Sequence, residues 1–152
     1  MSPGKISSKR VLDRLGTVDE LVSDLRAIPG DSLPDFLSDW RNSAAAESAI
    51  RRSLEALFDI GRHILAKGFA VGVVEYKETA EALLSHGVLS ADESALLRTL
   101  AGYRNRLVHF YHEVSRNELY EIRASGWSEI LSIAAAYRRW LAEHPERVDE
   151  GL

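Results

Sequence analysis

Residues 90–112 read SADESALLRTLAGYRNRLVHFYH, and this stretch decides the fold. It opens on Ser90 with Glu93 three residues later, which is the spacing of a helix capping box. The stretch therefore predicts a helix whose last turns carry the polar run from Arg104 to His109. Its apolar residues recur at three- and four-residue steps, as on one face of an amphipathic helix: Leu96, Leu97, Leu100, Tyr103, Leu107 and Val108.

The chain after this stretch predicts one further helix. Ser115 and Glu118 form a second capping box, and Pro145 marks the end of the helical pattern. The apolar residues between them again follow helical spacing: Leu119, Ile122, Trp127, Ile130, Leu131, Ala134, Tyr137 and Leu141.

The chain before this stretch predicts two long helices. The first ends at Pro29-Gly30, and its apolar stripe consists of Val11, Leu12, Leu15, Val18, Leu21, Val22, Leu25 and Ile28. Ser32 caps the second, which we expect to run unbroken to Lys67-Gly68. Its buried side is expected to hold Phe36, Trp40, Ala44, Ile50, Leu54, Leu57, Ile64 and Leu65.

The segment from Phe69 to Tyr76 is apolar but has no second strand to pair with, so we expect an ordered loop there. A short helix should follow it and end at Gly87. Four or five helices with short connections predict an all-α protein, an antiparallel up-down bundle. We expect a single domain over residues 1–152, with frayed ends at residues 1–8 and 145–152.

Composition narrows the function classes. The chain has 152 residues, of which 45% are hydrophobic and 28% charged, as in ordinary globular domains. It has no cysteine, which excludes disulfides and thiolate chemistry. No signal core or membrane-length apolar run is present, so we expect a cytoplasmic protein that does not enter membranes. A formal net charge of −4 means that any nucleic-acid contact must rest on a local basic patch.

The run from Tyr103 to His112 resembles a known family signature. Arg104, His109 and Tyr111 stand in the order Arg-x4-His-x-Tyr, which resembles HEPN-domain proteins and, within them, the HepT toxins of HEPN/MNT toxin–antitoxin pairs. By eye the resemblance extends from about Asp35 to Leu141. It implies a HEPN-like fold and a homodimer that cleaves RNA. It also implies an MNT-type nucleotidyltransferase antitoxin that transfers AMP to the motif tyrosine, here Tyr111.

The residue types suit RNA cleavage. Arg104 offers a rigid fork of donors for phosphate oxygens, and His109 can exchange the proton of a ribose 2′-hydroxyl or of the leaving 5′-oxygen. Attack by the 2′-hydroxyl then needs no metal and leaves a 2′,3′-cyclic phosphate. Asn105 is expected to orient His109 or bind backbone, Arg106 to contact a flanking phosphate, and His112 to act as an auxiliary base.

Helical geometry separates the two catalytic candidates. At about 100° per residue, Arg104 and His109 diverge by roughly 140° on an unbroken helix. They meet at one phosphate only if the helix loosens near His109 or if a second subunit supplies the other group. A symmetric dimer with this segment at its axis satisfies the second condition.

Simpler interpretations stay open. A histidine at a helix C-terminus often only complements the helix dipole, and Tyr111 can be an ordinary half-buried aromatic residue. The alternative function is a non-catalytic HEPN module that binds nucleotide, RNA or its partner and is only a substrate of the nucleotidyltransferase. We expect no metal and no cofactor, because the remaining histidines form no ligand pattern with nearby acids: His63, His86, His112 and His144.

Overall fold

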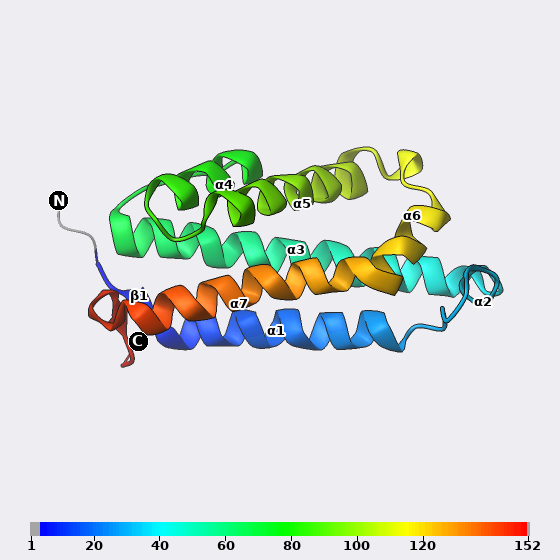
Figure 1. Ribbon diagram of the computed structural model, residues 1–152, viewed down its shortest axis with the longest axis horizontal. Helices are drawn as coiled ribbons and strands as arrows, with labels where there is room; N and C mark the ends of the chain where they lie inside the picture. Colours follow the sequence, from blue (N-terminus) through cyan, green and yellow to red (C-terminus); the bar gives the residue numbers. More distant parts are fainter. Residues whose placement is uncertain (1–3, 152) are drawn as a thin grey trace.

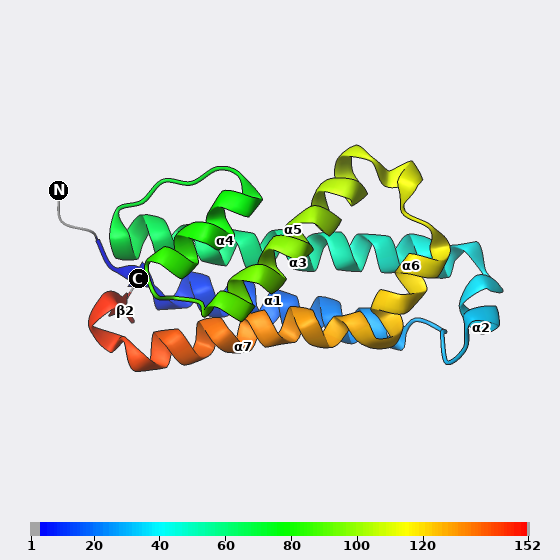
Figure 2. The ribbon, with the colours of Figure 1, turned by 45° about the horizontal axis from the view of Figure 1, so that its top comes forward.

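The computed structural model describes residues 4–151, except for the side chain of Tyr111. It is a helical bundle in which α1 (Ser8–Ala27), α3 (Trp40–Phe69) and α7 (Trp127–Glu143) lie side by side (Figure 1). α4 (Tyr76–Ser85) and α5 (Ala91–His109) form a second layer against α3, and α5 runs obliquely across it (Figure 2). α1 runs antiparallel to α3 and α7, so the predicted all-α antiparallel bundle is confirmed.

α1 follows its predicted stripe closely. Ser7 caps it by accepting a hydrogen bond from the Arg10 N–H, and the helix ends just before Pro29. Its buried residues pack mainly against α3: Val11, Leu15, Val18, Leu21, Val22 and Leu25. Leu12, which the sequence placed in the stripe, is 59% exposed.

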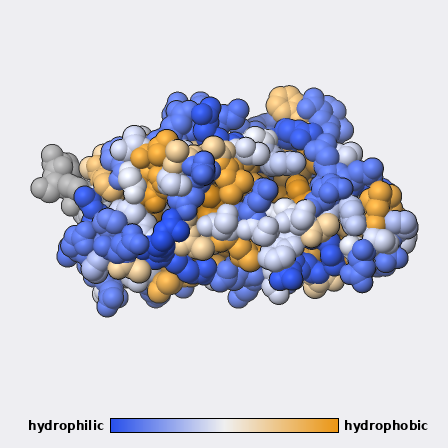
Figure 3. All heavy atoms as spheres, viewed as in Figure 1, coloured by the Kyte–Doolittle hydropathy of each residue, from blue (hydrophilic) through white to orange (hydrophobic). Residues whose placement is uncertain are grey.

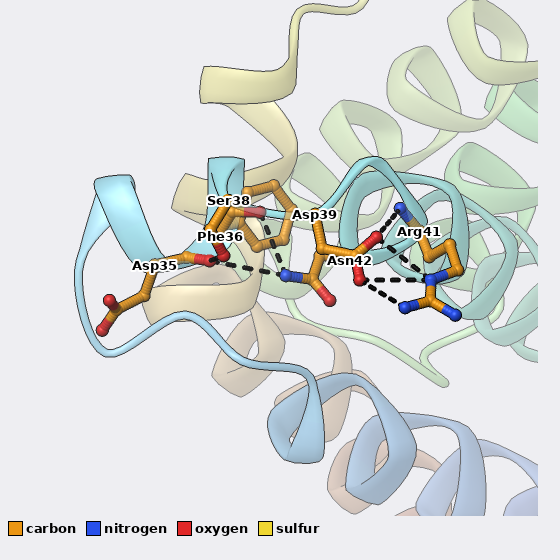
Figure 4. Close-up of polar contacts among 6 residues, drawn as sticks. All are labelled: Asp35, Phe36, Ser38, Asp39, Arg41 and Asn42. Atoms are coloured by element: carbon orange, nitrogen blue, oxygen red, sulfur yellow. Dashed lines mark hydrogen bonds and ion pairs between the residues drawn. The ribbon is translucent and has the colours of Figure 1, made fainter.

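The predicted helix from Ser32 is interrupted. Ser32 does cap a helix by accepting from the Asp35 N–H, but this helix, α2 (Leu33–Leu37), is a short one. Asp39 then caps α3, accepting hydrogen bonds from the backbone and side chain of Arg41, which lower the pKa of Asp39 to about 2. The buried Asn42 side chain donates to the Phe36 carbonyl at 3.1 Å and thereby ties α2 to α3 (Figure 4).

Because of this interruption, two residues that were predicted to be buried are exposed. Trp40 is 66% exposed and Ala44 is exposed, although both were expected on the buried side. The two residues between α2 and α3 shift the helical phase, so the spacing counted from Phe36 no longer applies after Asp39. From Ile50 onward the predicted positions are buried.

The second layer matches its sequence signals. Residues 70–75 form the predicted loop, and Gly87 adopts a φ of 75° in the turn after α4. The Ser90–Glu93 capping box is complete, because each side chain bonds the other residue's backbone N–H. Ser94 donates to the Ala80 carbonyl and thereby joins α5 to α4.

The last predicted helix is divided into three segments. α6 (Arg116–Glu121) leads into a π-helical segment, η2 (Ile122–Gly126), which leads into α7. Ser115 accepts from the Glu118 N–H as predicted, but the Glu118 carboxylate bonds Arg106, so the second capping box is half formed. Arg123, in η2, donates to the carbonyls of Ile28 and Arg26 at the end of α1.

The chain ends are paired where the sequence suggested fraying. α7 is followed by a 3-10 turn, η3 (Pro145–Arg147), and then by β2 (Val148–Asp149). β2 pairs in parallel with β1 (Ile6–Ser7). Ile6 is fully buried, and Arg147 donates to the carbonyl of Gly68. The charge of the tail after His144 suggested fraying, but the β1–β2 pairing, the burial of Ile6 and the bond from Arg147 to α3 hold residues 6–7 and 145–149 in place.

Candidate functional site

The predicted catalytic segment occupies the last turns of α5. The helix stays regular through His109 and ends at Phe110, whose N–H donates to the Arg106 carbonyl at 2.9 Å. The 3-10 turn η1 (Tyr111–Glu113) follows. The helix therefore loosens after His109 and not before it, so Arg104 and His109 remain about 140° apart around the axis.

Arg104 lies between α5, α3 and the start of α4. Its guanidinium stands 4.4 Å from the centroid of the Tyr76 ring, and its side chain is only 19% exposed. Its Nε atom is buried and makes no hydrogen bond with the part of the chain that the structure describes, where a Glu55 carboxylate oxygen lies 3.6 Å away. Arg104 is thus supported by a ring and a carboxylate, and it keeps donors for a further acceptor.

The surroundings of Arg104 are basic and ordered by α3. Arg51 pairs with the same Glu55 carboxylate at 3.5 Å. Arg62 donates to the Val74 carbonyl, pairs with Asp59 and lies 4.9 Å from the Tyr76 ring. Tyr76 also packs edge-on against the buried Phe58, with ring centroids 4.5 Å apart. Two guanidinium groups therefore contact one fixed aromatic ring, which favours an anion at this place.

His109 faces a different space. With Asn105, one turn earlier on α5, it lines an open groove of about 460 Å³ between α5 and the start of α4. The opposite wall comes from residues 74–77, and Phe110 completes the lining. Tyr76 belongs to both places, because its ring contacts Arg104 and it also lines the groove. The structure thus brings Asn105 and His109 together in the groove, whereas Arg104 points toward Tyr76 and Glu55 and does not line the groove.

Arg106 has a partner within the chain. Its guanidinium forms two hydrogen bonds, of 2.9 and 3.1 Å, with the Glu118 carboxylate and a third with the Glu113 carbonyl. These bonds raise the pKa of Arg106 and lower that of Glu118. Arg106 therefore fixes the connection between α5 and α6, and its expected contact with a flanking phosphate stays a prediction.

The two remaining candidates lie in η1. Tyr111 opens this turn, and its side chain is outside the part that the structure describes. His112 follows it and is exposed. Both residues stand directly beyond the end of α5, beside the residues that line the groove.

Three residues of this region were missed from the sequence as site residues: Glu55, Tyr76 and Lys77. These residues lie on α3 and at the start of α4, and no spacing within the motif indicates them. Within residues 4–151 no three histidine or acidic side chains gather closely enough to hold a metal ion. Among the same residues, no helix combines the length and apolar composition needed to cross a membrane.

Sequence comparison places the chain in a family. Residues 18–136, more than half of the chain, match the family described as Ribonuclease HepT-like. The tRNA nuclease HepT of Aphanizomenon flos-aquae (strain 2012/KM1/D3) is 26% identical over 107 residues, which cover 70% of this chain and 73% of that protein.

Solved structures show the same fold. A tri-AMPylated HEPN toxin of Shewanella oneidensis, in complex with an MNT antitoxin, superposes with a TM-score of 0.78 at 17% identity, covering 87% of this chain and 98% of that one. YutE, a cytosolic protein of unknown function from Bacillus subtilis, has a TM-score of 0.76 at 19% identity, covering 95% and 98%. At these identities the likeness concerns the fold alone. By its sequence match and its HEPN fold, the chain belongs to the HepT-like ribonuclease family.

Proposed function

We propose that this chain is the toxin of a HEPN/MNT toxin–antitoxin pair and a metal-independent endoribonuclease that acts in the cytoplasm. One observation carries the proposal: an imidazole in an open groove and a partly buried guanidinium that contacts Tyr76 and Glu55 stand at the same end of α5. Family membership, a relative named as a tRNA nuclease and a structural neighbour solved with its MNT antitoxin support the same reading.

The two groups divide the chemistry between them. His109 takes the proton of a ribose 2′-hydroxyl, whose oxygen bonds to the neighbouring phosphorus. The bond from phosphorus to the 5′-oxygen breaks, and that oxygen leaves with a proton from a histidine. Arg104 binds the phosphate oxygens while charge develops on them. Asn105 orients His109, and His112 is an auxiliary base. Arg106 is a positioning residue that fixes the end of η1.

The separation of Arg104 from His109 calls for two subunits. In a symmetric dimer with the ends of α5 at its axis, Arg104 of one protomer faces His109 of its partner, and the same arrangement occurs twice. Neither group then has to leave the position that it occupies in the single chain. Arg104, whose side chain is 19% exposed, then meets the substrate phosphate with the exposed part of its side chain, while its buried Nε stays inside the protein.

The cognate antitoxin acts on Tyr111. The tyrosine hydroxyl attacks the α-phosphate of ATP, pyrophosphate leaves, and AMP stays on the tyrosine. An adenylate beside His109 places a bulky anion where the RNA phosphate must bind, and it competes for Arg104. The proposal is supported by the position of Tyr111 directly beyond α5, and by the AMPylated state in which the Shewanella oneidensis toxin was solved with its MNT antitoxin.

Cleavage of RNA by the purified chain in EDTA is the direct test. Arg104→Ala and His109→Ala should each abolish cleavage while circular dichroism stays helical, and Arg104→Lys should be impaired, because a point charge does not reproduce the fork. Arg98→Ala is the matched control, since Arg98 lies on the same helix, is 53% exposed and pairs only loosely with Glu81 at 3.6 Å. Full activity in His109→Ala would refute the proposed site. Absence of cleavage in the unmodified wild type would favour the non-catalytic module.

Modification is tested separately. The chain is co-expressed with its cognate nucleotidyltransferase, and the peptide that contains Tyr111 is weighed by mass spectrometry. Additions of the mass of AMP, absent in Tyr111→Phe, are the expected result. An unmodified peptide in cells where toxicity is nevertheless suppressed would mean that the antitoxin acts by complex formation alone.

A further inference from the structure

The groove beside His109 has an unusual rim. Phe110 lines it and is 50% exposed, and Val74, on the opposite wall, is 81% exposed. In Figure 3 a small hydrophobic patch stands out at the top right, over the chain that follows α5, among hydrophilic atoms. Large apolar side chains exposed on both sides of a polar groove are typical of a binding site. An exposed aromatic ring in particular offers a flat face to a flat ligand.

The polar groups of the groove restrict what that ligand is. Lys77 supplies a cation and Asn105 an amide with both donors and acceptors. Glu75 also lines the groove, and its carboxylate disfavours a phosphate close to it while accepting hydrogen bonds from amino groups. A ligand that satisfies this set has a flat ring, an amino group on the ring and a negative charge some distance from it. An unpaired nucleotide has all three.

We propose that Glu75, Lys77, Asn105 and Phe110 form a nucleotide subsite that holds one unpaired base next to the scissile phosphate. The base stacks on Phe110, and its exocyclic amino group donates to Glu75. Lys77 pairs with the phosphate on the far side of that nucleotide. This subsite rests on the proposed ribonuclease function, since it binds the same RNA that His109 acts on.

The subsite has two consequences for specificity. A base inside a duplex is already stacked on both faces, so Phe110 can receive only a base that is unpaired or at the end of a strand. Adenine, cytosine and guanine carry an exocyclic amino group, whereas uracil has none and holds its one ring N–H donor between two carbonyl oxygens, which Glu75 repels. Binding should therefore favour single strands over duplexes, and adenine or cytosine over uracil.

The test measures binding without cleavage. Fluorescein-labelled 2′-O-methyl decamers of adenine, cytosine or uracil lack the 2′-hydroxyl nucleophile, so the wild-type chain cannot cut them. Fluorescence anisotropy should give tighter binding to the adenine and cytosine decamers than to the uracil decamer or to an adenine–uracil duplex. Phe110→Ala should weaken binding to the adenine decamer roughly 5- to 100-fold, whereas Phe110→Trp should retain it.

Two of the other three side chains, Lys77 and Glu75, have their own signatures. Lys77→Ala should weaken all three decamers alike and reduce the salt dependence of binding by about one phosphate contact. Glu75→Gln should reduce the ratio of the affinity for the adenine decamer to the affinity for the uracil decamer. Leu84→Ala and Lys67→Ala are matched controls, because Leu84 is exposed at the other end of α4, Lys67 is exposed near the end of α3, and neither lines the groove. Both controls should bind like the wild type.

Three results would overturn the subsite. The first is an affinity for the adenine decamer that Phe110→Ala leaves unchanged, and the second is a duplex that binds as tightly as the single strand. The third is a Phe110→Ala chain that sediments as a monomer where the wild type is a dimer and that binds the adenine decamer with unchanged affinity per subunit. Phe110 would then be a contact between subunits. Binding that depends on Phe110 in a chain that cuts no ordinary RNA would instead refute the ribonuclease and support the subsite.

Discussion

The close contact between α3 and α7 makes a sharp prediction about stability. Tyr137 on α7 is fully buried, and its hydroxyl donates to the Leu57 carbonyl of α3 at 3.1 Å. Gly61, one turn after Leu57, leaves the space for this hydroxyl, because a Cβ at position 61 would lie 2.8 Å from it. The same Cβ would lie 2.9 Å from a methyl group of Leu83. Gly61→Ala therefore forces two helices apart or displaces the hydroxyl.

The size of the effect follows from three contributions. Alanine in place of glycine inside a helix stabilises by about 1 kcal/mol. Overpacking a filled core costs about 1–3 kcal/mol. Loss of the buried hydrogen bond costs about 0.5–1.5 kcal/mol more. We expect Gly61→Ala to lower the free energy of unfolding by about 0.5–3.5 kcal/mol. Tyr137→Phe alone should lower it by about 0.5–1.5 kcal/mol, since it removes only the hydrogen bond.

The double variant distinguishes this contact from a general effect. In the Tyr137→Phe background the oxygen is gone, so Gly61→Ala should cost at least about 1 kcal/mol less than in the wild type. Urea denaturation followed by circular dichroism at 222 nm, at one fixed protein concentration, gives the four free energies. Gly16→Ala is the control, because no atom lies within 4 Å of its added Cβ, and it should stabilise by up to about 1 kcal/mol. If the effects of Gly61→Ala and Tyr137→Phe on the free energy of unfolding add to within about 0.5 kcal/mol of that of the double variant, the reasoning is refuted.

Three further outcomes are expected. Tyr76→Leu should lower kcat for RNA cleavage several-fold while Tyr76→Phe does not, because the ring supports Arg104; steady-state kinetics would decide. Burial, with Arg10 and Lys67 nearby, lowers the pKa of His63 from its usual 6.5. The unfolded chain therefore binds a proton at His63 at a higher pH than the folded chain, so the free energy of unfolding should fall as the pH drops below about 6.5. Over the same pH range the melting temperature of His63→Gln should fall less than that of the wild type. Ser90→Ala should cost about 1 kcal/mol in urea denaturation, through loss of the capping box.

The sequence predicted best where local signals decide the structure. The Ser90 capping box and the apolar spacing after it located α5 and, with it, the motif at the C-terminal end of that helix. The break between α2 and α3 was missed because apolar residues continue at helical spacing across it. What makes the break is the competing cap at Asp39 and the bond of Asn42 to Phe36, both local contacts that apolar spacing does not reveal. The exposed Trp40 is the consequence.

The site was predictable in position but not in composition. Arg104, Asn105 and His109 lie on one helix, so a local pattern could find them. Glu55 and Tyr76 come from α3 and α4, and their contact with Arg104 exists only through tertiary packing. The same holds for Arg106, whose partner Glu118 looked like half of a capping box. A carboxylate in that position has two competing donors, and spacing alone does not say which of them it bonds.

The central claim is that Arg104 of one subunit and His109 of another form each catalytic site, and mixing two inactive variants tests it directly. Arg104→Ala and His109→Ala chains are unfolded together, refolded as a mixture and assayed for RNA cleavage in EDTA. Every mixed dimer then holds one site with both groups intact, so random pairing should restore about a quarter of wild-type activity. Each variant refolded alone should stay inactive. A mixture as inactive as its components, with mixed dimers present, would contradict a shared site.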